Sequence, residues 1–398
     1  MERLIARQPE DLKQKQDIDA NVLHEVKEID VGRGRILLES EGGSKTRWEP
    51  FDSLMVSTGA LPVRPPVEGI DAEGIFGVGT LQNALDLWRF MEQTQPTKAV
   101  VIGGGYIGLE MAENLLLRDM DVSLVEKAPE VMGTLDADMG ALVSKALVDV
   151  GVNLYTNEGL KAFEAAEGRV RKVITEKRTL PADLVILGMG VRPNISLARQ
   201  AGIKIGVSGA VEVDSTMRTG VDGVWAGGDC TESFHLVSRR PVTIALGTVA
   251  NKHGRVAGSN IGGVYATFPG VVGTAVSKIC SVEVARTGLQ EKEIGQIGKE
   301  YVSAVIDTTT RAGYYPDTGP ITVKVLAEKG NGRLLGGQIV GKEGAAKRID
   351  VLATALHAGL TLEEIVHLDL SYAPPYSPLN DPVAVAARVA LKKLVGNP

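Results

Sequence analysis

The sequence is poor in cysteine and contains no long apolar run, and each shortage excludes a class of protein. Only two of its 398 residues are cysteines, Cys230 and Cys280, which lie far apart without a CxxC or any neighbouring ligand pattern. We therefore expect neither a metal site nor a disulfide framework, but two small buried thiols in a cytoplasmic protein. No run reaches the roughly 18 apolar residues of a membrane span, and the first residues are too polar for a signal peptide, so we expect no membrane partner.

Positive charge is not in excess either, and aromatic residues make up only 4% of the chain. Lysines and arginines number 43 against 49 aspartates and glutamates, which gives a formal net charge of −6. Because nucleic-acid binding needs a basic patch or stripe, we expect no nucleic-acid partner. The 44% of hydrophobic residues and the 47 glycines indicate a soluble globular protein with many tight turns, and the length suggests two or three domains.

Strands and helices alternate in the middle of the chain. This alternation is typical of a doubly wound α/β domain, which we place at residues 96–215. Its predicted strands lie at 99–102, 121–126, 160–176 (a pair) and 182–190, and its predicted helices at 106–120 and 139–151. It is flanked by a strand and turn at 51–69, a helix at 80–95, a strand and turn at 219–230, and a helix at 247–263.

From residue 265 the pattern changes to strands followed by helices. The predicted strands lie at 279–287, 301–309, 321–328 and 333–341, with a hairpin turn at 329–332, and the predicted helices at 343–359, 361–368 and 381–396. This order indicates an antiparallel sheet with helices, a separate α+β domain at residues 265–398.

The stretch VVIGGGYIGLEM carries a GxGxxG motif between a strand and a helix. Gly103 allows a tight turn, Gly105 lets the backbone approach a pyrophosphate, and Gly108 permits close packing of the helix on the strand. Glu126 ends the next strand, where a carboxylate binds the ribose 2′-hydroxyl of NADH and repels the 2′-phosphate of NADPH. This favours NADH, although the adjacent Lys127 keeps NADPH as an alternative. A glycine turn without a ligand is the other interpretation.

Two further stretches flank this motif and indicate a known family. STGALPVRP at 57–65 resembles the Thr-Gly turn of two-dinucleotide flavoproteins, and TGVDGVWAGGDC at 219–230 resembles their second flavin motif. Together with GVRPN at 190–194, their order is similar to that of the pyridine nucleotide-disulfide oxidoreductases. The resemblance implies an α/β FAD/NAD(P)-binding fold of two dinucleotide domains and a C-terminal dimerisation domain, with flavin-domain segments at 1–95 and 216–264.

The same resemblance implies contacts with both cofactors. Thr58, Gly59, Gly228 and Asp229 are expected to bind FAD, the aspartate through the ribityl chain of the flavin. Gly190 is expected to border the NADH site, where the chain leaves the nucleotide domain.

Roles also follow for two residues on the helix after the glycine turn. Tyr106 resembles the tyrosine that covers the flavin, and Glu110 resembles the acid near flavin N5. A helix-surface aromatic and a solvated charge are the alternative interpretations. The helix that starts at Gly247 is expected to point its positive end at the flavin, which stabilises negative charge on the reduced ring.

The C-terminal part is similar to one branch of the family. FPGVVGTAVSKICSVEVARTGL, RAGYYP and SYAPPYSPLNDPV resemble the coenzyme A-disulfide reductases, a branch that includes NADH oxidases and persulfide reductases. In this branch tyrosines reach across a homodimer into the partner's active site. The resemblance carries that role to Tyr315 and Tyr372, with Tyr314 and Tyr376 as weaker candidates. A packed interface tyrosine is the alternative for each.

Two parts of the family pattern are not found in the sequence. No GxGxxG lies before residue 103 and no cysteine before residue 230, whereas the family begins with a FAD-binding βαβ unit followed by a redox cysteine. The resemblance therefore implies an N-terminally truncated member in which this first FAD unit is missing.

The resemblance implies a FAD-dependent oxidoreductase that passes hydride from NADH to flavin and on to coenzyme A disulfide or a persulfide. For a truncated chain, a non-catalytic NADH-binding dimer is the alternative. An NADH oxidase or a flavin reductase of the ferredoxin-reductase type are the others, and the segment YAPPYS argues against the last of these.

Overall fold

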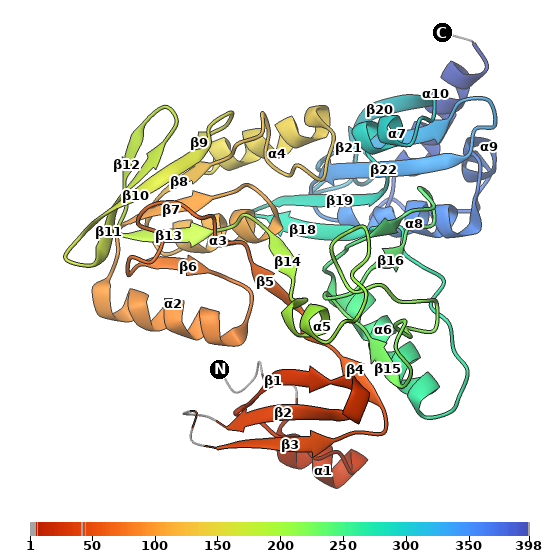
Figure 1. Ribbon diagram of the computed structural model, residues 1–398. Helices are drawn as coiled ribbons and strands as arrows, with labels where there is room; N and C mark the ends of the chain where they lie inside the picture. Colours follow the sequence, from red (N-terminus) through yellow and green to blue (C-terminus); the bar gives the residue numbers. More distant parts are fainter. Residues whose placement is uncertain (1–4, 6, 41–42, 44, 397–398) are drawn as a thin grey trace. The chain divides into compact units, whose positions relative to one another are not determined.

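The computed structural model describes residues 5, 7–40, 43 and 45–396. Contacts within the chain divide it into two compact units. The first comprises Met1–Gly59, Pro193–Glu232 and Gly247–Phe268, and the second comprises Ala60–Arg192, Ser233–Leu246 and Pro269–Pro398. Each unit has its own sheets (Figure 1), and the residues predicted to bind FAD lie in the first, whereas the glycine turn lies in the second.

The first unit contains a three-stranded antiparallel sheet and a separate parallel strand pair. The sheet has the order β1 (His24–Asp30), β2 (Arg35–Ser40), β3 (Thr46–Pro50), and the pair joins β4 (Leu54–Val56) to β15 (Val224–Ala226). Its helices are α1 (Pro9–Gln16), α5 (Ser196–Gln200) and α6 (Gly247–Ile261), with a 3-10 turn at Val31–Arg33. Val56, Val224 and Ala226 are buried with Val211 and Ile203 in one core, so the strand pair is anchored by apolar packing.

The second unit is built around a five-stranded parallel sheet. Its strand order is β6 (Ile75–Gly77), β13 (Leu184–Leu187), β7 (Lys98–Ile102), β8 (Asp121–Val125), β9 (Asn153–Tyr155), with helices α2 (Leu81–Thr94), α3 (Tyr106–Leu116) and α4 (Ala137–Asp149). Residues 99–102 and 184–187 are all buried, as expected for strands covered on both faces. The predicted doubly wound arrangement is confirmed.

One detail of this region differs from the predictions. The helix predicted at 106–120 ends at Leu116, because Asp119 takes a left-handed conformation with φ of 59°. Before it in the chain, β6 pairs with β13 and α2 packs with β6, and the compact unit that contains them starts at Ala60. The predicted domain boundaries stay predictions.

Smaller strands complete this part of the unit. The predicted pair at 160–176 is confirmed as β10 (Leu160–Ala166) and β11 (Arg169–Thr175), to which β12 (Thr179–Pro181) adds a third antiparallel strand. The remaining pairs are β5 (Ala60–Pro62) with β14 (Val191–Pro193), and β16 (Ser233–Phe234) with β17 (Pro241–Val242).

The C-terminal part of the second unit is a five-stranded antiparallel sheet with helices, as predicted. Its order is β18 (Ala275–Ile279), β19 (Val282–Gly288), β22 (Leu334–Gly341), β21 (Pro320–Glu328), β20 (Tyr301–Thr309). Its helices are α7 (Glu291–Gln296), α8 (Ile349–Ala358), α9 (Leu362–Val366) and α10 (Pro382–Leu394), with a 3-10 turn at Ala346–Arg348. In Figure 1 it lies beside the parallel sheet of the same unit.

Two predictions for the C-terminal part are wrong in position. The single strand predicted at 279–287 is the end of β18, a turn and β19, because Cys280 has a φ of 52° and a two-residue turn pairs Ile279 with Val282. The helix predicted from residue 343 begins only at Ile349, since Gly344 has a φ of 86°. Among the described helices, none combines the length and hydropathy that crossing a membrane would require.

Candidate functional site

The glycine turn between β7 and α3 shows a steric reason for two of its three glycines. A Cβ on Gly108 would lie 1.9 Å from the carbonyl oxygen of Gly103, and a Cβ on Gly103, whose φ is 99°, would lie 2.7 Å from the carbonyl oxygen of Gly188. A Cβ on Gly105 would meet nothing closer than 3.9 Å. The fold itself therefore has room for a side chain at Gly105, so packing within the chain does not explain this glycine, and its approach to a pyrophosphate stays a prediction.

A cavity of about 500 Å³ opens at this turn. Its walls come from the carboxyl ends of the parallel strands, which is where open α/β sheets bind nucleotides. The lining residues include Gly103, Gly105, Glu126, Lys127, Gly133, Thr134, Glu158, Glu176, Gly188, Met189 and Gly190. Four of the predicted NADH residues therefore line one cavity: Gly103, Gly105, Glu126 and Gly190. Gly108 is not among the lining residues and instead packs against the Gly103 carbonyl of the turn.

Glu126 is held in a defined position at the end of β8. Its Oε2 accepts a hydrogen bond of 2.7 Å from the Gly104 N–H, and its Oε1 accepts one of 2.8 Å from the Ala128 N–H. Each carboxylate oxygen has a second lone pair, so the side chain can still accept from a ribose hydroxyl. The glycine turn and the acidic residue, separate in the sequence, are therefore one hydrogen-bonded unit.

Two other carboxylates of the cavity wall were missed by sequence reasoning. Glu158 is only 1% exposed and pairs with the Arg178 guanidinium at 2.9 Å, and that guanidinium lies 4.0 Å from the centre of the Tyr155 ring. Glu176 accepts a hydrogen bond of 3.1 Å from the Gly159 N–H. The signal for Glu158 is its place just after β9, because parallel strands bring their carboxyl ends to one edge.

Tyr106 and Glu110 lie one turn apart on α3 and have different partners. The Tyr106 hydroxyl is 3.4 Å from the Thr134 Oγ1, and burial raises the pKa of this tyrosine. The exposed Glu110 accepts a hydrogen bond of 2.9 Å from the hydroxyl of Ser277 on β18. Sequence reasoning did not foresee this serine, and the roles of both residues toward a flavin stay predictions.

One predicted flavin residue of the first unit, Asp229, has a carboxylate oxygen with unsatisfied hydrogen-bonding capacity. Asp229 Oδ1 is buried and has no hydrogen-bond partner among the described residues, and burial raises the pKa of its carboxyl group. An unpaired buried acceptor costs about 1–3 kcal/mol, so this oxygen fits a hydroxyl group of a ligand such as the flavin ribityl chain. Gly228 has a φ of 85° and turns the backbone at this point.

Thr58 and Gly59 form the second half of this predicted flavin region. The Thr58 hydroxyl donates to the carbonyl oxygen of Asn194 at 2.5 Å, and the Asn194 N–H donates to the Gly59 carbonyl at 2.9 Å. Gly59 has a φ of 68° and space around the position of a Cβ. The Thr-Gly turn is therefore closed by backbone groups, and its contact with FAD stays a prediction.

His253 on α6 supports the turn that carries Asp229. Its Nδ1 accepts a hydrogen bond of 3.3 Å from the Gly228 N–H and lies 3.1 Å from the Thr231 hydroxyl. The ring is fully buried with its edge toward Phe268, and this burial lowers the pKa of His253 to about 4. A neutral ring is required, because a protonated Nδ1 could not accept from Gly228.

This burial predicts a loss of stability in acid. A histidine with a folded pKa of about 4 and an ordinary unfolded value takes up a proton only on unfolding between those pH values, so the free energy of unfolding falls as the pH drops through that window. From about pH 7.5 to pH 5 the expected loss from His253 is about 2 kcal/mol. In His253→Asn, whose amide oxygen can replace Nδ1, urea unfolding should lose about 2 kcal/mol less over this range. An unchanged pH dependence in this variant would contradict the assignment.

The two cysteines have environments unsuited to a reactive thiolate. Cys230 is buried, and its thiol contacts the carbonyl oxygens of Val56 and Gly227 at 3.7 and 3.4 Å. Burial and the nearby Glu113 raise the pKa of Cys280, which is partly exposed. The prediction of a buried thiol is confirmed for Cys230 and wrong for Cys280, which lies in the β18–β19 turn.

The four predicted tyrosines lie in the C-terminal part of the second unit. Tyr314 and Tyr372 interact with one another, and they are 78% and 46% exposed, whereas Tyr376 is 77% exposed and Tyr315 is partly buried. Exposed tyrosines are enriched at protein interfaces because a large apolar ring carries a polar tip. A reach into a partner subunit stays a prediction for all four.

Comparison with known proteins agrees with this geometry. A family model described as pyridine nucleotide-disulphide oxidoreductase matches residues 3–254, and the dimerisation domain of that family matches residues 274–381. An NAD(P)H coenzyme A polysulfide/persulfide reductase of Pyrococcus horikoshii is 38% identical over 389 residues, which cover 98% of this chain and 86% of that protein. An NADH oxidase of Methanocaldococcus jannaschii is 36% identical over 392 residues, with 98% and 87% covered.

The solved structure of an NAD-dependent persulfide reductase from A. fulgidus matches with a TM-score of 0.95 at 39% identity, over 99% of this chain and 73% of that one. These matches confirm the predicted fold class and its dimerisation domain. The chain belongs to the pyridine nucleotide-disulphide oxidoreductase family.

Proposed function

We propose that this chain is a FAD-dependent NADH oxidoreductase whose electrons pass to a small thiol or disulfide of the coenzyme A type. The observation that carries the proposal is the cavity at the glycine turn, with Glu126 fixed on its rim by two backbone N–H groups. The relatives of this chain, which include a coenzyme A polysulfide/persulfide reductase and an NADH oxidase, support the acceptor class.

The residues of the cavity would bind and orient the dinucleotide. Gly105 presents its backbone N–H group at the start of α3, where the positive end of the helix attracts a pyrophosphate, whereas the Gly103 N–H donates to the Val125 carbonyl at 2.8 Å and shapes the turn. Glu126 accepts from the ribose hydroxyls, and Glu176 adds negative charge to the same wall, whereas Glu158 is paired with Arg178. Against Glu126 and Glu176 the lining places the single positive charge of Lys127, so the cavity favours NADH over NADPH.

The first unit would hold the flavin. Asp229 accepts from a ribityl hydroxyl through its unpaired Oδ1, and Gly228 keeps side-chain atoms away from the same turn. Thr58 and Gly59 would contribute the second turn. When bound, FAD would supply a redox carrier that takes two electrons from NADH and passes them to the thiol or disulfide acceptor.

The C-terminal part would form a homodimer and complete the thiol site. The dimerisation domain of the family covers β18 to the segment before α10, and it includes all four tyrosines. Tyr315 and Tyr372 would then contact the partner's substrate, and the exposure of Tyr314 and Tyr376 fits the same interface.

A second candidate function is the transfer of electrons from NADH to flavin without a thiol step, as in an NADH oxidase or flavin reductase, or NADH binding alone. It is favoured by the environments of Cys230 and Cys280, of which the first is buried and the second has a raised pKa. Thiolate chemistry needs the opposite, an accessible cysteine with a lowered pKa.

One preparation of the protein tests these functions together. We expect a yellow dimer that oxidises NADH and reduces coenzyme A disulfide. Asp229→Ala should weaken flavin retention about 10- to 100-fold, because a hydrogen bond to a charged group contributes about 1.5–3 kcal/mol, whereas Asp222→Ala in the same stretch should not. A yellow protein that oxidises NADH with oxygen but not with the disulfide would favour the second function. A colourless protein would contradict the flavin assignment.

A further inference from the structure

The segment 132–138 forms one side of the nucleotide cavity, and we call it the wall segment. Gly133 and Thr134 line the cavity, and the Met132 N–H donates a hydrogen bond of 2.7 Å to the carbonyl oxygen of Gly104 inside the glycine turn. The Gly104 N–H in turn bonds Glu126. A shift of the wall segment would therefore also move the glycine turn and Glu126, the groups that would contact the dinucleotide.

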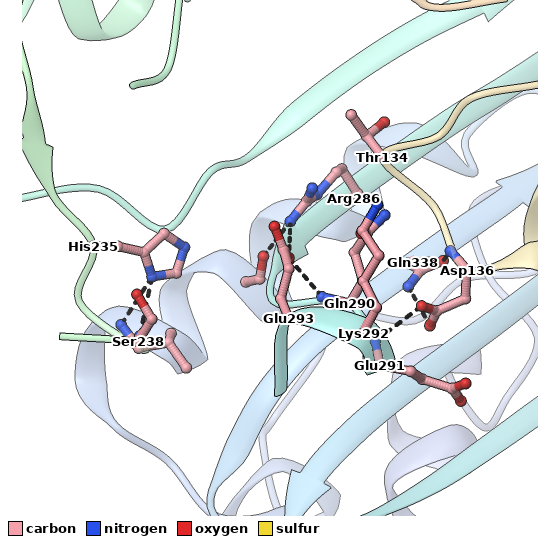
Figure 2. A network of polar contacts seen from close by, with 12 residues as sticks. Thr134, Asp136, His235, Ser238, Arg286, Gln290, Glu291, Lys292, Glu293 and Gln338 are labelled. Atoms are coloured by element: carbon pink, nitrogen blue, oxygen red, sulfur yellow. Dashed lines mark hydrogen bonds and ion pairs between the residues drawn. The ribbon is translucent and has the colours of Figure 1, made fainter. Parts of the chain in front are cut away.

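Polar groups of the C-terminal sheet hold this segment in place (Figure 2). The Gln338 side chain on β22 accepts from the Asp136 N–H at 2.8 Å and donates to the Asp136 Oδ2 at 2.7 Å. The Glu291 N–H donates to the Asp136 Oδ1 at 2.9 Å, and the Gln290 side chain donates to the Gly133 carbonyl at 3.0 Å. Residues of the C-terminal part of the chain therefore bind both backbone and side-chain groups of the wall segment.

Lys324 on β21 lies at the centre of these contacts. The side chain is 2% exposed, and its ammonium lies 3.1 Å from Asp136, 2.8 Å from Asp138 and 2.9 Å from Glu291. Two of the three carboxylates belong to the wall segment. Of the three, only Asp136 is buried, since the side chains of Asp138 and Glu291 are 49% and 36% exposed. Removing the ammonium would leave the buried Asp136 carboxylate without a compensating charge and close to two further carboxylates, which destabilises this arrangement.

We propose that Lys324 and Gln338 are positioning residues for the dinucleotide site, which hold the wall segment against the glycine turn from the C-terminal sheet. Neither lines the cavity, so they would act on the dinucleotide only through the wall segment. The inference rests on the proposed function, since it takes NADH to be the ligand. Its consequence is that a domain assigned to dimerisation also sets the affinity for NADH.

The test compares two variants with a matched control in the full chain. Lys324→Met removes the central charge, and Gln338→Glu places a carboxylate against Asp136. Lys299→Met also removes an ion pair of the C-terminal sheet, with Glu328, but contacts no residue of the wall segment. In fluorescence titrations with NADH, we expect the dissociation constant to rise about 10-fold in the first two variants and not in the control, within the range for coupling through a packed polar network.

Hydrogen exchange separates positioning from general stability. In the ligand-free protein, the amides of Met132 and Asp136 should exchange faster in Lys324→Met than in wild type, and Lys299→Met should leave them unchanged. Equal NADH affinity in folded Lys324→Met would overturn the inference, as would a parallel loss in the control. A wild-type protein that does not bind NADH would contradict the proposed function instead, and the inference with it.

Discussion

Gly108→Ala should weaken NADH binding by about 100-fold, because the added methyl group clashes with the backbone of the glycine turn. The added Cβ would lie 1.9 Å from the Gly103 carbonyl oxygen and 3.1 Å from its carbonyl carbon. Both contacts are with backbone, which no rotamer change relieves, so the cost should lie at the upper end of the range of about 1–3 kcal/mol for overpacking. Either α3 moves away from β7 or the turn opens, and the Gly105 N–H at the start of the helix is then displaced from the cavity.

The matched control is Gly295→Ala in α7, where nothing lies within 4 Å of the new Cβ. That variant should bind NADH as the wild type does and be as stable or slightly more so, because alanine is the better helix former. Isothermal titration with NADH and thermal unfolding would be measured for both. Wild-type affinity in Gly108→Ala would show that the turn is not the dinucleotide site.

Glu126→Gln should shift the preference between the two nicotinamide dinucleotides. The wild type is expected to favour NADH, because the Glu126 carboxylate would face the 2′-phosphate of NADPH. A neutral amide removes this repulsion and also leaves one of the N–H groups of Gly104 and Ala128 without its acceptor. We expect NADH to bind more weakly and the ratio of kcat/KM for NADH over NADPH to fall about 10-fold or more, since NADH loses a hydrogen bond to a charged acceptor, which contributes about 1.5–3 kcal/mol, while NADPH loses a repulsion.

Glu176→Gln tests whether the effect belongs to the ribose position or to the charge of the cavity as a whole. Glu176 lines the same cavity but accepts only from the Gly159 N–H, away from the glycine turn. Its substitution should change the cofactor ratio much less than Glu126→Gln. Equal shifts in the two variants would assign cofactor choice to total charge, and a wild type that prefers NADPH would overturn the role of Glu126.

Local patterns predicted the strands, the helix and the turn around the GxGxxG motif well. The GxGxxG motif, the buried strand at 99–102 and the acid at 126 lie within one β-helix-β stretch, where neighbours in sequence are neighbours in space. Glu158 lies at the same edge of the sheet, where the parallel strands end. It was missed because β9, the strand before it, is only three residues long and was not recognised in the sequence. The strands of the C-terminal sheet were predicted from their alternation of apolar and polar residues. The exception is the boundary between β18 and β19, which was missed because a turn of only two residues, Cys280 and Ser281, reverses the chain there.

The partners of the wall segment could not be predicted. Asp136 and Gln338 are 202 positions apart, and Lys324 and Asp138 are 186 apart. A buried lysine in the strand ITVKVLAE reads in sequence as the polar side of an alternating strand, because no local pattern records which distant carboxylates will surround it. The same is true of Ser277, whose hydroxyl engages Glu110 across 167 positions.

The sequence by itself determined the class of fold, the place of the glycine turn and the position of the acid that ends the next strand, since each follows from backbone geometry within a few turns of chain. Only the tertiary structure decided that Glu126 and the glycine turn share hydrogen bonds, that Asp229 keeps an unpaired oxygen, and that Lys324 lies between three carboxylates. The physical reason is that burial and charge pairing depend on which segments are in contact. Tertiary packing decides these contacts, and spacing along the chain does not.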